Sequence, residues 1–313
     1  MSRGRGGYIG FNRVPAAAGV NSAASGVWSL REAEALKRAG TWPVVAPGNV
    51  GSGLQLWLDA AAPETLFDAT SGGSLVAADG GVARWEDKSG NARHMTQGTS
   101  GSRPARKTAI QGGLDVLRFD GSADFMSVAS STAAFKFLHG SAYSIFAVVR
   151  IRALNTREFI FETGPLGSPS GDAGSLGAAL AIFSDGKLFH FVRAGGTAEI
   201  NNQSAASAFS SGSSYVVSIV GDVGSGTAAA RSVAKINAGS AIENNTQTDT
   251  PSTSSSRINL TIGRAIGYNN DGSVEYDQYA DLDFCEIIIY DSALSSTDRA
   301  AVETYLLAKW GIT

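Results

Sequence analysis

The chain has 313 residues, a formal net charge of −3, and 43% hydrophobic against 17% charged residues. This composition excludes a disordered chain, because it supplies enough apolar surface for a sizeable core. Lys and Arg are scattered and form no basic block, so nucleic acid is not expected as a partner. No stretch approaches the ~20 apolar residues of a membrane span, and no membrane insertion is expected. Cys285, the sole cysteine, excludes an internal disulfide and a thiolate metal cluster.

Residues 1–50 differ from the remainder and form the first predicted unit. Ser29 precedes Glu32 by three positions, which is capping-box spacing, so a short helix is predicted to start there and to end near Gly40. A helix of about three turns is not stable alone in water and must dock onto something. Four large apolar side chains are predicted to make that contact: Trp28, Leu30, Leu36 and Trp42. They dock the segment either on its own domain, as a cap, or on a larger assembly, as an anchor.

Residues 51–313 form the second predicted unit, in which apolar residues alternate with period two. Leu54, Leu56 and Leu58 are predicted to share one strand face, and a similar alternation covers residues 143–152. The Asp185-Gly186 pair between two apolar runs predicts a hairpin with a type I′ turn. Further strands are predicted over residues 213–222, 257–266 and 281–292, and a polar surface loop over residues 244–257.

A helix is predicted at the C-terminus. Ser295 precedes Asp298 by three positions, which suits an N-terminal cap. Val302, Leu306 and Trp310 then recur at helical spacing before Gly311. Together with the short, regularly spaced strands, this pattern predicts an all-β sandwich closed by one terminal helix.

Several strings carry a family resemblance. They are LQLWLDAA (residues 54–61), VARWEDKSGNARHMTQ (82–97), RPARKT (103–108), LDVLRFDGSADFMSV (114–128) and CEIIIYDSALSSTDRAAVETYLLAKWGI (285–312). In this order they resemble the landmarks of laminin-G and concanavalin A-like lectin domains found in bacterial surface and bacteriophage proteins. The resemblance implies a concanavalin A-like jelly-roll β-sandwich over residues 51–313, preceded by the short helical anchor.

The leader carries a second resemblance. GYIGFNRVP (residues 7–15) and SGVWSLREAEALKRAGTWP (25–43) are similar to N-terminal segments of tailed-phage structural proteins. The resemblance implies a virion protein attached at the tail or its fibres. The N-terminus has no apolar core of signal-peptide length, so synthesis in the host cytoplasm without a signal peptide is expected. Its expected partners are other virion proteins and host-surface glycans, and analogy with fibre proteins suggests a trimer.

Catalytic signatures are sparse. The strings of serine hydrolases, P-loop enzymes and zinc proteases are absent, and the three histidines, at positions 94, 139 and 190, lack metal-ligand spacing. Residues 224–229 (GSGTAA) mimic a dinucleotide fingerprint but lack the long helix that follows it, so a turn is predicted. Cys285 lies in an apolar run and is predicted to be a core residue.

The acid-rich stretch from residue 269 to residue 283 is the main candidate for a site. Its carboxylate and amide side chains are Asn269, Asn270, Asp271, Glu275, Asp277, Asp281 and Asp283. Calcium takes six to eight oxygen ligands, so calcium is the one candidate cofactor. The site residues predicted for a metal ion or a glycan are Asn269, Asp271, Glu275, Asp277 and Asp281. The alternative interpretation is a solvated acidic loop.

Some glycosidases of this fold carry the strand pattern Glu-x-Asp-x-x-Glu, which Glu275 and Asp277 begin to match. Asp281 comes one position late, which in a strand would keep it on the same face as Glu275 and Asp277 but further along. No catalytic residue is predicted. Glu286 interrupts an apolar strand, on a face predicted to include Phe284, Ile288 and Tyr290, and is expected to find an Arg or backbone donors as partners. The predicted function is therefore a non-enzymatic adhesin, with a decoration protein and a glycoside hydrolase as alternatives.

Overall fold

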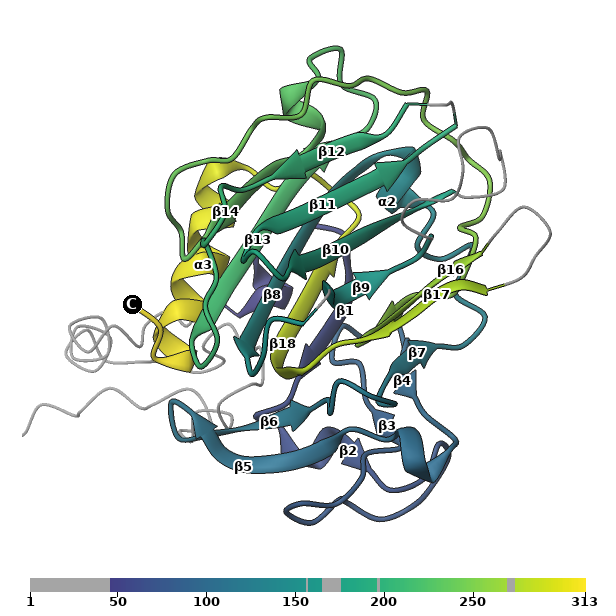
Figure 1. Ribbon diagram of the computed structural model, residues 1–313, viewed down its shortest axis with the longest axis vertical. Coiled ribbons are helices and arrows are strands. Elements are labelled where there is room, and N and C mark those ends of the chain that lie inside the picture. Colours follow the sequence, from purple (N-terminus) through teal and green to yellow (C-terminus); the bar gives the residue numbers. More distant parts are fainter. Residues whose placement is uncertain (1–45, 156, 165–175, 196–197, 269–273) are drawn as a thin grey trace, which may run out of the picture.

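The protein, in a computed structural model that describes residues 46–155, 157–164, 176–195, 198–268 and 274–313, is a sandwich of two antiparallel sheets (Figure 1). The predicted all-β sandwich with a C-terminal helix is confirmed. The predicted anchor residues Trp28, Leu30, Leu36 and Trp42 lie outside the described residues. The unit boundary at residue 50 stays a prediction, although Ala46 and Val50 already pack against the sandwich.

Sheet A contains β1 (Leu54–Asp59), β5 (Ala105–Gln111), β6 (Leu114–Arg118), β8 (Ala142–Ile151), β13 (Ser214–Asp222), β14 (Val233–Ile236) and β18 (Leu282–Tyr290). Sheet B contains β2 (Leu66–Phe67), β3 (Arg84–Trp85), β4 (Met95–Thr96), β7 (Met126–Val128), β9 (Arg157–Glu162), β10 (Gly177–Phe183), β11 (Leu188–Arg193), β12 (Ile200–Gln203) and β15 (Thr261–Ile262). A separate hairpin pairs β16 (Arg264–Tyr268) with β17 (Val274–Tyr279). The α-helices of the described residues are α2 (Phe137–Gly140) and α3 (Ser296–Trp310).

The strand order is β14-β13-β8-β18-β6-β5 in sheet A, with β1 also paired to β18, and β12-β11-β10-β9-β15-β7-β4-β3-β2 in sheet B. Figure 1 shows β10, β11 and β12 of sheet B in front of β8, β13 and β18 of sheet A. Strands distant in sequence are therefore neighbours in both sheets. The loops at the strand ends bring together residues more than one hundred positions apart.

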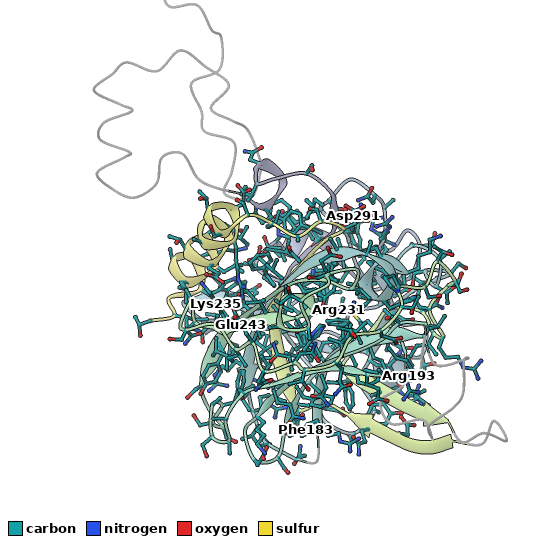
Figure 2. All side chains as sticks on the ribbon, turned by 90° about the horizontal axis from the view of Figure 1, so that it is seen from above. Phe183, Arg193, Arg231, Lys235, Glu243 and Asp291 are labelled. Carbon is teal, nitrogen blue, oxygen red and sulfur yellow. The ribbon has the colours of Figure 1, made fainter. Side chains whose placement is uncertain are left out.

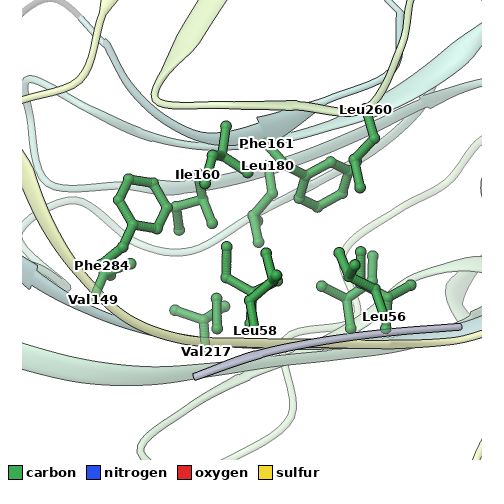
Figure 3. Packing of buried hydrophobic residues seen from close by; sticks show 14 of the residues in the cluster. Leu56, Leu58, Val149, Ile160, Phe161, Leu180, Val217, Leu260 and Phe284 are labelled. Carbon is green, nitrogen blue, oxygen red and sulfur yellow. The ribbon is translucent and has the colours of Figure 1, made fainter. Parts of the chain in front are cut away.

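The main core lies between the sheets and follows from the period-two alternation. Inward side chains of both sheets meet there, as Figure 3 shows for Leu56, Leu58, Val149, Val217 and Phe284 of sheet A against Ile160, Phe161 and Leu180 of sheet B. Leu54 departs from the predicted pattern: a register shift between Leu54 and Leu56 turns its side chain to the outer face of sheet A.

The outer face of sheet A is covered by α3 and forms a second core. Ser295 caps the helix by accepting the Asp298 backbone N–H at 3.1 Å, and Gly311 ends it in the left-handed conformation at φ 61°. Val302, Leu306 and Trp310 pack on Phe146 and Val148 of β8, together with other outward residues of the sheet. The predicted terminal helix and its apolar spacing are thus confirmed.

Glu286 lies between sheet A and α3 with no exposed surface. Its Oε1 accepts the Trp57 indole N–H at 2.7 Å and the Tyr305 hydroxyl at 3.1 Å. Its Oε2 accepts Lys309 Nζ at 2.7 Å and the Trp310 indole N–H at 2.8 Å. The expectation of an Arg or backbone partner was therefore wrong: a lysine and three aromatic side chains satisfy the carboxylate.

Lys309 also binds Asp59 Oδ1 at 2.7 Å, and Lys88 binds Asp59 Oδ2 at 2.7 Å. Burial and the neighbouring Asp59 raise the pKa of Glu286. Although burial opposes the ammonium charge, Glu286 and Asp59 raise the pKa of Lys309. The predicted face of Glu286 needs one correction, because a bulge between Phe284 and Glu286 turns Phe284 into the inter-sheet core.

Side chains close two open strand edges. Along β1, Asp87 Oδ1 accepts the Trp57 N–H at 2.9 Å, and Asn91 Nδ2 donates to the Leu54 carbonyl at 2.9 Å. Along β12, Asn245 Oδ1 accepts the Asn201 N–H at 3.1 Å, and Asn244 makes the equivalent contacts to Gln203. Carboxylate and amide groups therefore replace a neighbouring strand and protect these edges from pairing with another chain.

Two predicted local structures differ in detail. The β10–β11 hairpin is present, but only Gly186 of the predicted turn pair has a positive φ, 71°, and a type I′ turn needs two such residues. Of the predicted strand over residues 257–266, residues 257–260 carry no strand. The remainder is divided by Gly263, at φ 76°, where a side chain would collide with the ring of Phe119. The division separates β15 in sheet B from β16 in the hairpin. Residues 244–257 carry no strand, as predicted.

Among the helices of the described residues, none is long and apolar enough to cross a membrane.

Lys309→Met tests the role of the lysine. The substitution keeps much of the apolar stem but leaves the fully buried Glu286 beside Asp59 without its shared cation. Removing one partner of a buried ion pair costs about 3–5 kcal/mol. We expect a loss of this size in the free energy of unfolding, measured by urea denaturation at pH 7. Lys187→Met, in the exposed pair with Asp185, should change it by less than about 0.5 kcal/mol; equal effects would contradict the assigned role.

Candidate functional site

The predicted acid-rich site is only partly described. Asn269 and Asp271 lie outside the described residues, and Glu275 lies in β17 with its side chain outside them. β17 ends at Tyr279, so the prediction that Asp281 continues the same strand face was wrong. In the described part of the chain, no group of three or more His, Cys, Asp or Glu residues could hold a metal ion. The remaining predicted residues, Asp277 and Asp281, take part in different ion pairs.

Asp277 belongs to a cluster on the outward side of the β16–β17 hairpin. Arg264 binds it with both arms, Nε to Oδ1 at 2.7 Å and Nη2 to Oδ2 at 2.8 Å, and the Tyr279 hydroxyl donates to Oδ2 at 3.1 Å. The Arg264 guanidinium lies 4.7 Å from the ring centroid of Phe125 and 5.2 Å from that of Tyr279. We call Phe125, Arg264, Asp277 and Tyr279 the hairpin surface.

The hairpin surface is accessible. The Asp277 side chain is 35% exposed and that of Arg264 21%, and the Phe125 and Tyr279 rings are half-buried. A two-armed Arg–carboxylate pair is geometrically fixed, so Asp277 is held in place before any ligand arrives. Aromatic rings beside fixed polar groups are typical of small-molecule sites. The arrangement can stack an apolar ring face and bond to adjacent hydroxyl groups.

The other acidic residues of the stretch form structural ion pairs. Asp281 pairs with Arg152, and burial raises the pKa of Asp281. Asp283 is fully buried and binds Arg118 with both oxygens, at 2.7 and 2.9 Å. These arginines come from β6 and from the end of β8, so the pairs join sheet strands to the chain leaving the hairpin. Asp281 and Asp283 therefore form neither a solvated acidic loop nor a ligand site, because both are bound to arginines.

The inward side of the hairpin rests on the outer face of sheet B. Ala265 of β16 packs there in a cluster with Phe159, Phe191 and neighbouring residues of β9, β10 and β11. Phe183 and Phe189 are stacked at 4.8 Å, and Phe189 and Phe191 at 6.3 Å, so these rings occupy each other's faces. This cluster is therefore packing rather than a ligand platform. Figure 2 shows Phe183 and Arg193 on the same side of the molecule as the hairpin, away from Lys235 and Glu243 near α3.

Two buried glutamates of β9 hold the hairpin on sheet B. Glu162 Oε1 accepts the backbone N–H of Ile266 in β16 at 2.9 Å. Glu158 accepts the backbone N–H groups of Asn155, at 2.8 Å, and of Asp281, where the chain leaves the hairpin. Burial raises the pKa of Glu158, and burial raises that of Glu162 well above its usual range.

The remaining candidate groups are structural. His94 Nδ1 accepts the Asp87 N–H, His139 Nε2 lies 3.0 Å from the Ser254 carbonyl, and His190 Nδ1 lies 2.8 Å from Ser232 Oγ. Burial lowers the pKa of His190 to about 3, so the ring is neutral at physiological pH. Cys285 is buried, and burial raises the pKa of its thiol well above the usual range, as expected of a core residue.

Sequence reasoning missed three residues of the hairpin surface: Phe125, Arg264 and Tyr279. A signal for the hairpin exists, since RAIGY and VEYDQY alternate around the turn-forming string NNDGS. That signal alone would have placed Arg264 opposite Gln278, because Tyr268 pairs with Val274; a register shift between Gly267 and Tyr268 brings Tyr279 opposite Arg264 instead. No pattern near Phe125 in the sequence could have predicted its contact with Arg264, because Phe125 lies in the loop before β7 and meets the hairpin only in the folded chain.

No family model matches the chain, and no curated protein matches its sequence. Among solved structures, Trypanosoma rangeli sialidase in complex with the inhibitor DANA has a TM-score of 0.49 and 14% identity, over 81% of this chain and 33% of that one. The binding domain of botulinum neurotoxin DC in complex with SialylT has 0.47 and 12%, over 82% and 52%. The CBM40 of Ruminococcus gnavus IT-sialidase bound to α2,3 sialyllactose has 0.43 and 15%, over 60% and 95%. The chain thus spans about a third of that sialidase.

Asp124 makes stability depend on pH beside the hairpin surface. It precedes Phe125, and burial and the nearby Asp120 raise the pKa of Asp124 from 3.8 to about 7. The folded state therefore holds a proton that the unfolded chain releases, so this group's contribution is fully present below pH 3.8 and is lost as the pH rises to about 7.

We expect Asp124→Asn to keep the acceptor for the Asp120 N–H, 3.1 Å away, and to flatten this part of the pH–stability profile, measured by urea denaturation from pH 4 to pH 8. Asp185→Asn, at an exposed turn, serves as the control. An unchanged slope in Asp124→Asn would contradict the raised pKa.

Proposed function

We propose that the chain is a non-catalytic adhesin whose sandwich binds host-surface glycans through the hairpin surface. The observation that carries the proposal is the pair of half-buried rings, Phe125 and Tyr279, beside the two-armed Arg264–Asp277 pair. A sugar ring has an apolar C–H face and a rim of hydroxyl groups. The hairpin surface offers a complement to each.

Charge and preorganisation narrow the ligand chemistry. Arg264 and Asp277 neutralise each other, so the surface favours uncharged hydroxyl groups over an anion or a cation. Asp277 is oriented by Arg264 and by Tyr279, and holding polar groups in their bound geometry lowers the entropic cost of binding. Hydrogen bonds to charged groups contribute about 1.5–3 kcal/mol each.

The position of the hairpin supports presentation from an assembly. Ala46 and Val50, where the described chain starts, pack on the outer face of sheet A, whereas the hairpin rests on the outer face of sheet B. A leader that attaches the protein to a virion would therefore leave the glycan-binding side free. Tail or fibre attachment, virion partners and a trimer are part of this proposal and rest on the leader's resemblance to phage structural proteins.

The absence of catalysis is also part of the proposal. Asp277 pairs with Arg264 and Asp281 with Arg152, so the two acids are held in separate ion pairs and do not form the facing carboxylate pair that glycoside hydrolysis uses. Asp120 and Asp124 differ in pKa, as an acid–base pair would, but Asp120 accepts the backbone N–H groups of its own turn, residues 122–124. Both residues therefore serve the turn that precedes Phe125.

Glycan binding is tested on a glycan array, followed by calorimetry with the strongest ligand. We expect Tyr279→Ala and Asp277→Ala each to weaken binding about tenfold, since a lost stacking or hydrogen-bond contribution of about 1.4 kcal/mol gives that factor. Asp185→Ala, at the exposed β10–β11 turn and outside the hairpin surface, should bind like the unmodified chain.

A silent array would instead favour a decoration protein. Release of reducing sugar that disappears in Glu275→Gln would establish a glycoside hydrolase. Either result contradicts the proposed adhesin.

Attachment through the leader is tested by deleting residues 1–45, which retains the segment packed on sheet A. We expect the shortened protein to stay folded by circular dichroism and to be missing from purified particles, whereas the full chain is present. Normal incorporation of the shortened protein would contradict the anchor. Trp28→Ala combined with Trp42→Ala in the full chain should reproduce the loss, because these rings are the predicted contacts.

A further inference from the structure

The contact between the hairpin and sheet B contains oxygen atoms that nothing satisfies. Glu162 Oε2 and Gln278 Oε1 are buried and, among the described residues, have no hydrogen-bond partner. Gln278 pairs across the hairpin with Ala265, which packs on sheet B and directly precedes Ile266, the residue whose N–H binds Glu162. The two unsatisfied oxygens therefore belong to the contact itself, Gln278 Oε1 on the inward side of the hairpin and Glu162 Oε2 on sheet B.

A buried carboxyl oxygen without a donor is tolerated only when the group is neutral. An ionised Glu162 would hold an uncompensated charge in an apolar contact that includes Phe159 and Phe191. When Glu162 is protonated, one carboxyl oxygen still accepts the Ile266 N–H, and the other becomes an O–H donor. Gln278 Oε1 is an acceptor that lacks such a donor. The closed contact therefore depends on one proton.

The charged surroundings of Glu162 offer little compensation. Among the described residues, the charged groups that act on it are Arg264 and Asp277, which lie on the hairpin and bind each other with both arms. Its neighbours within the sheet, Ala179 of β10 and Thr261 of β15, are uncharged. Glu158, the other glutamate that holds the hairpin, accepts N–H groups on both oxygens and does not share the defect.

We propose that the β16–β17 hairpin is a pH-dependent flap, closed on sheet B while the Glu162 carboxyl is protonated and released when it ionises. Release lets water reach the carboxylate and breaks the bond from Ile266. It also moves Arg264, Asp277 and Tyr279 away from Phe125, which stays on the loop before β7. The hairpin surface is complete only in the closed state.

Release of the flap is measured by hydrogen–deuterium exchange of the β17 amides from pH 5 to pH 9, corrected for the intrinsic exchange rate. Because opening releases one proton, the opening constant rises about tenfold per pH unit between the usual pKa of a solvated glutamate, 4.5, and the raised pKa of Glu162 in the closed state. The β10–β11 amides, in a hairpin without such a carboxyl, should show no such rise and report on global unfolding in the same sample.

Glu162→Gln carries the same acceptor but cannot ionise, so its flap should stay closed across the range. Glu158→Gln is the matched control and should keep the pH response. Asp124 also titrates in this pH range, with a pKa of about 7, so both variants are also made together with Asp124→Asn. Any remaining pH response then does not come from Asp124. A flat profile for β17 in the unmodified chain, or an unchanged rise in Glu162→Gln, would overturn the flap. If Glu162→Gln fails to fold, the β17 and β10–β11 profiles of the unmodified chain still decide.

The effect on binding rests on the function proposed above, whereas the flap itself does not. With the best array ligand, affinity should stay constant while the closed state predominates and should fall about tenfold per pH unit once the opening constant of β17 exceeds one, whereas Glu162→Gln should bind equally across the range. A pH-dependent flap with no glycan ligand would refute the adhesin alone. Glycan binding with pH-independent β17 exchange would refute the flap alone.

Discussion

The buried carboxylate of Glu286 in β18 joins β1, near the start of the described chain, to α3 at its end. Trp57 in β1 reaches it across 229 positions, and Lys309 and Trp310 reach it from α3. A buried charge with an incomplete set of donors is strongly unfavourable, so β1, β18 and α3 must be correctly placed together. The sandwich depends on this constraint because β18 is the strand to which β1, β6 and β8 all pair.

Side-chain oxygens also take the place of a neighbouring strand elsewhere in the molecule. Asp87 does this for β1, Asn245 for β12, and Glu162 for β16. The first two groups lie at the rim of the sheets and are satisfied: Asp87 Oδ2 accepts further hydrogen bonds, and the uncharged Asn245 amide also donates. Among the described residues, Glu162 Oε2 has no partner. The same interaction therefore has two consequences: at the rim it protects an edge, and beneath the hairpin it makes an attachment sensitive to one proton.

Most of the fold could be predicted from patterns between residues that are near one another in the sequence. Alternation over β8 and capping around Ser295 depend on neighbours in sequence, and both predictions are confirmed. The errors have long-range causes: Gly263 breaks a predicted strand because of Phe119, and the bulge before Glu286 reverses the face of Phe284. The candidate site was harder, since distant arginines recruited Asp281 and Asp283, and Phe125 joins Asp277 only through the fold. Acidic spacing alone could not distinguish ligands from ion-pair partners.

The antiparallel pairing of β1 with β18 has a mechanical consequence. In a protein held by its leader and bound through its hairpin, tension enters at the start of β1 and at the start of β18, which directly follows the hairpin. Leu54, at the start of β1, pairs with Tyr290 at the far end of β18, so the two pulled ends lie at opposite ends of the paired stretch. The force then runs along the strands and loads their hydrogen bonds together instead of peeling them one by one. Such shear loading suits a protein that must hold a particle on a surface against flow.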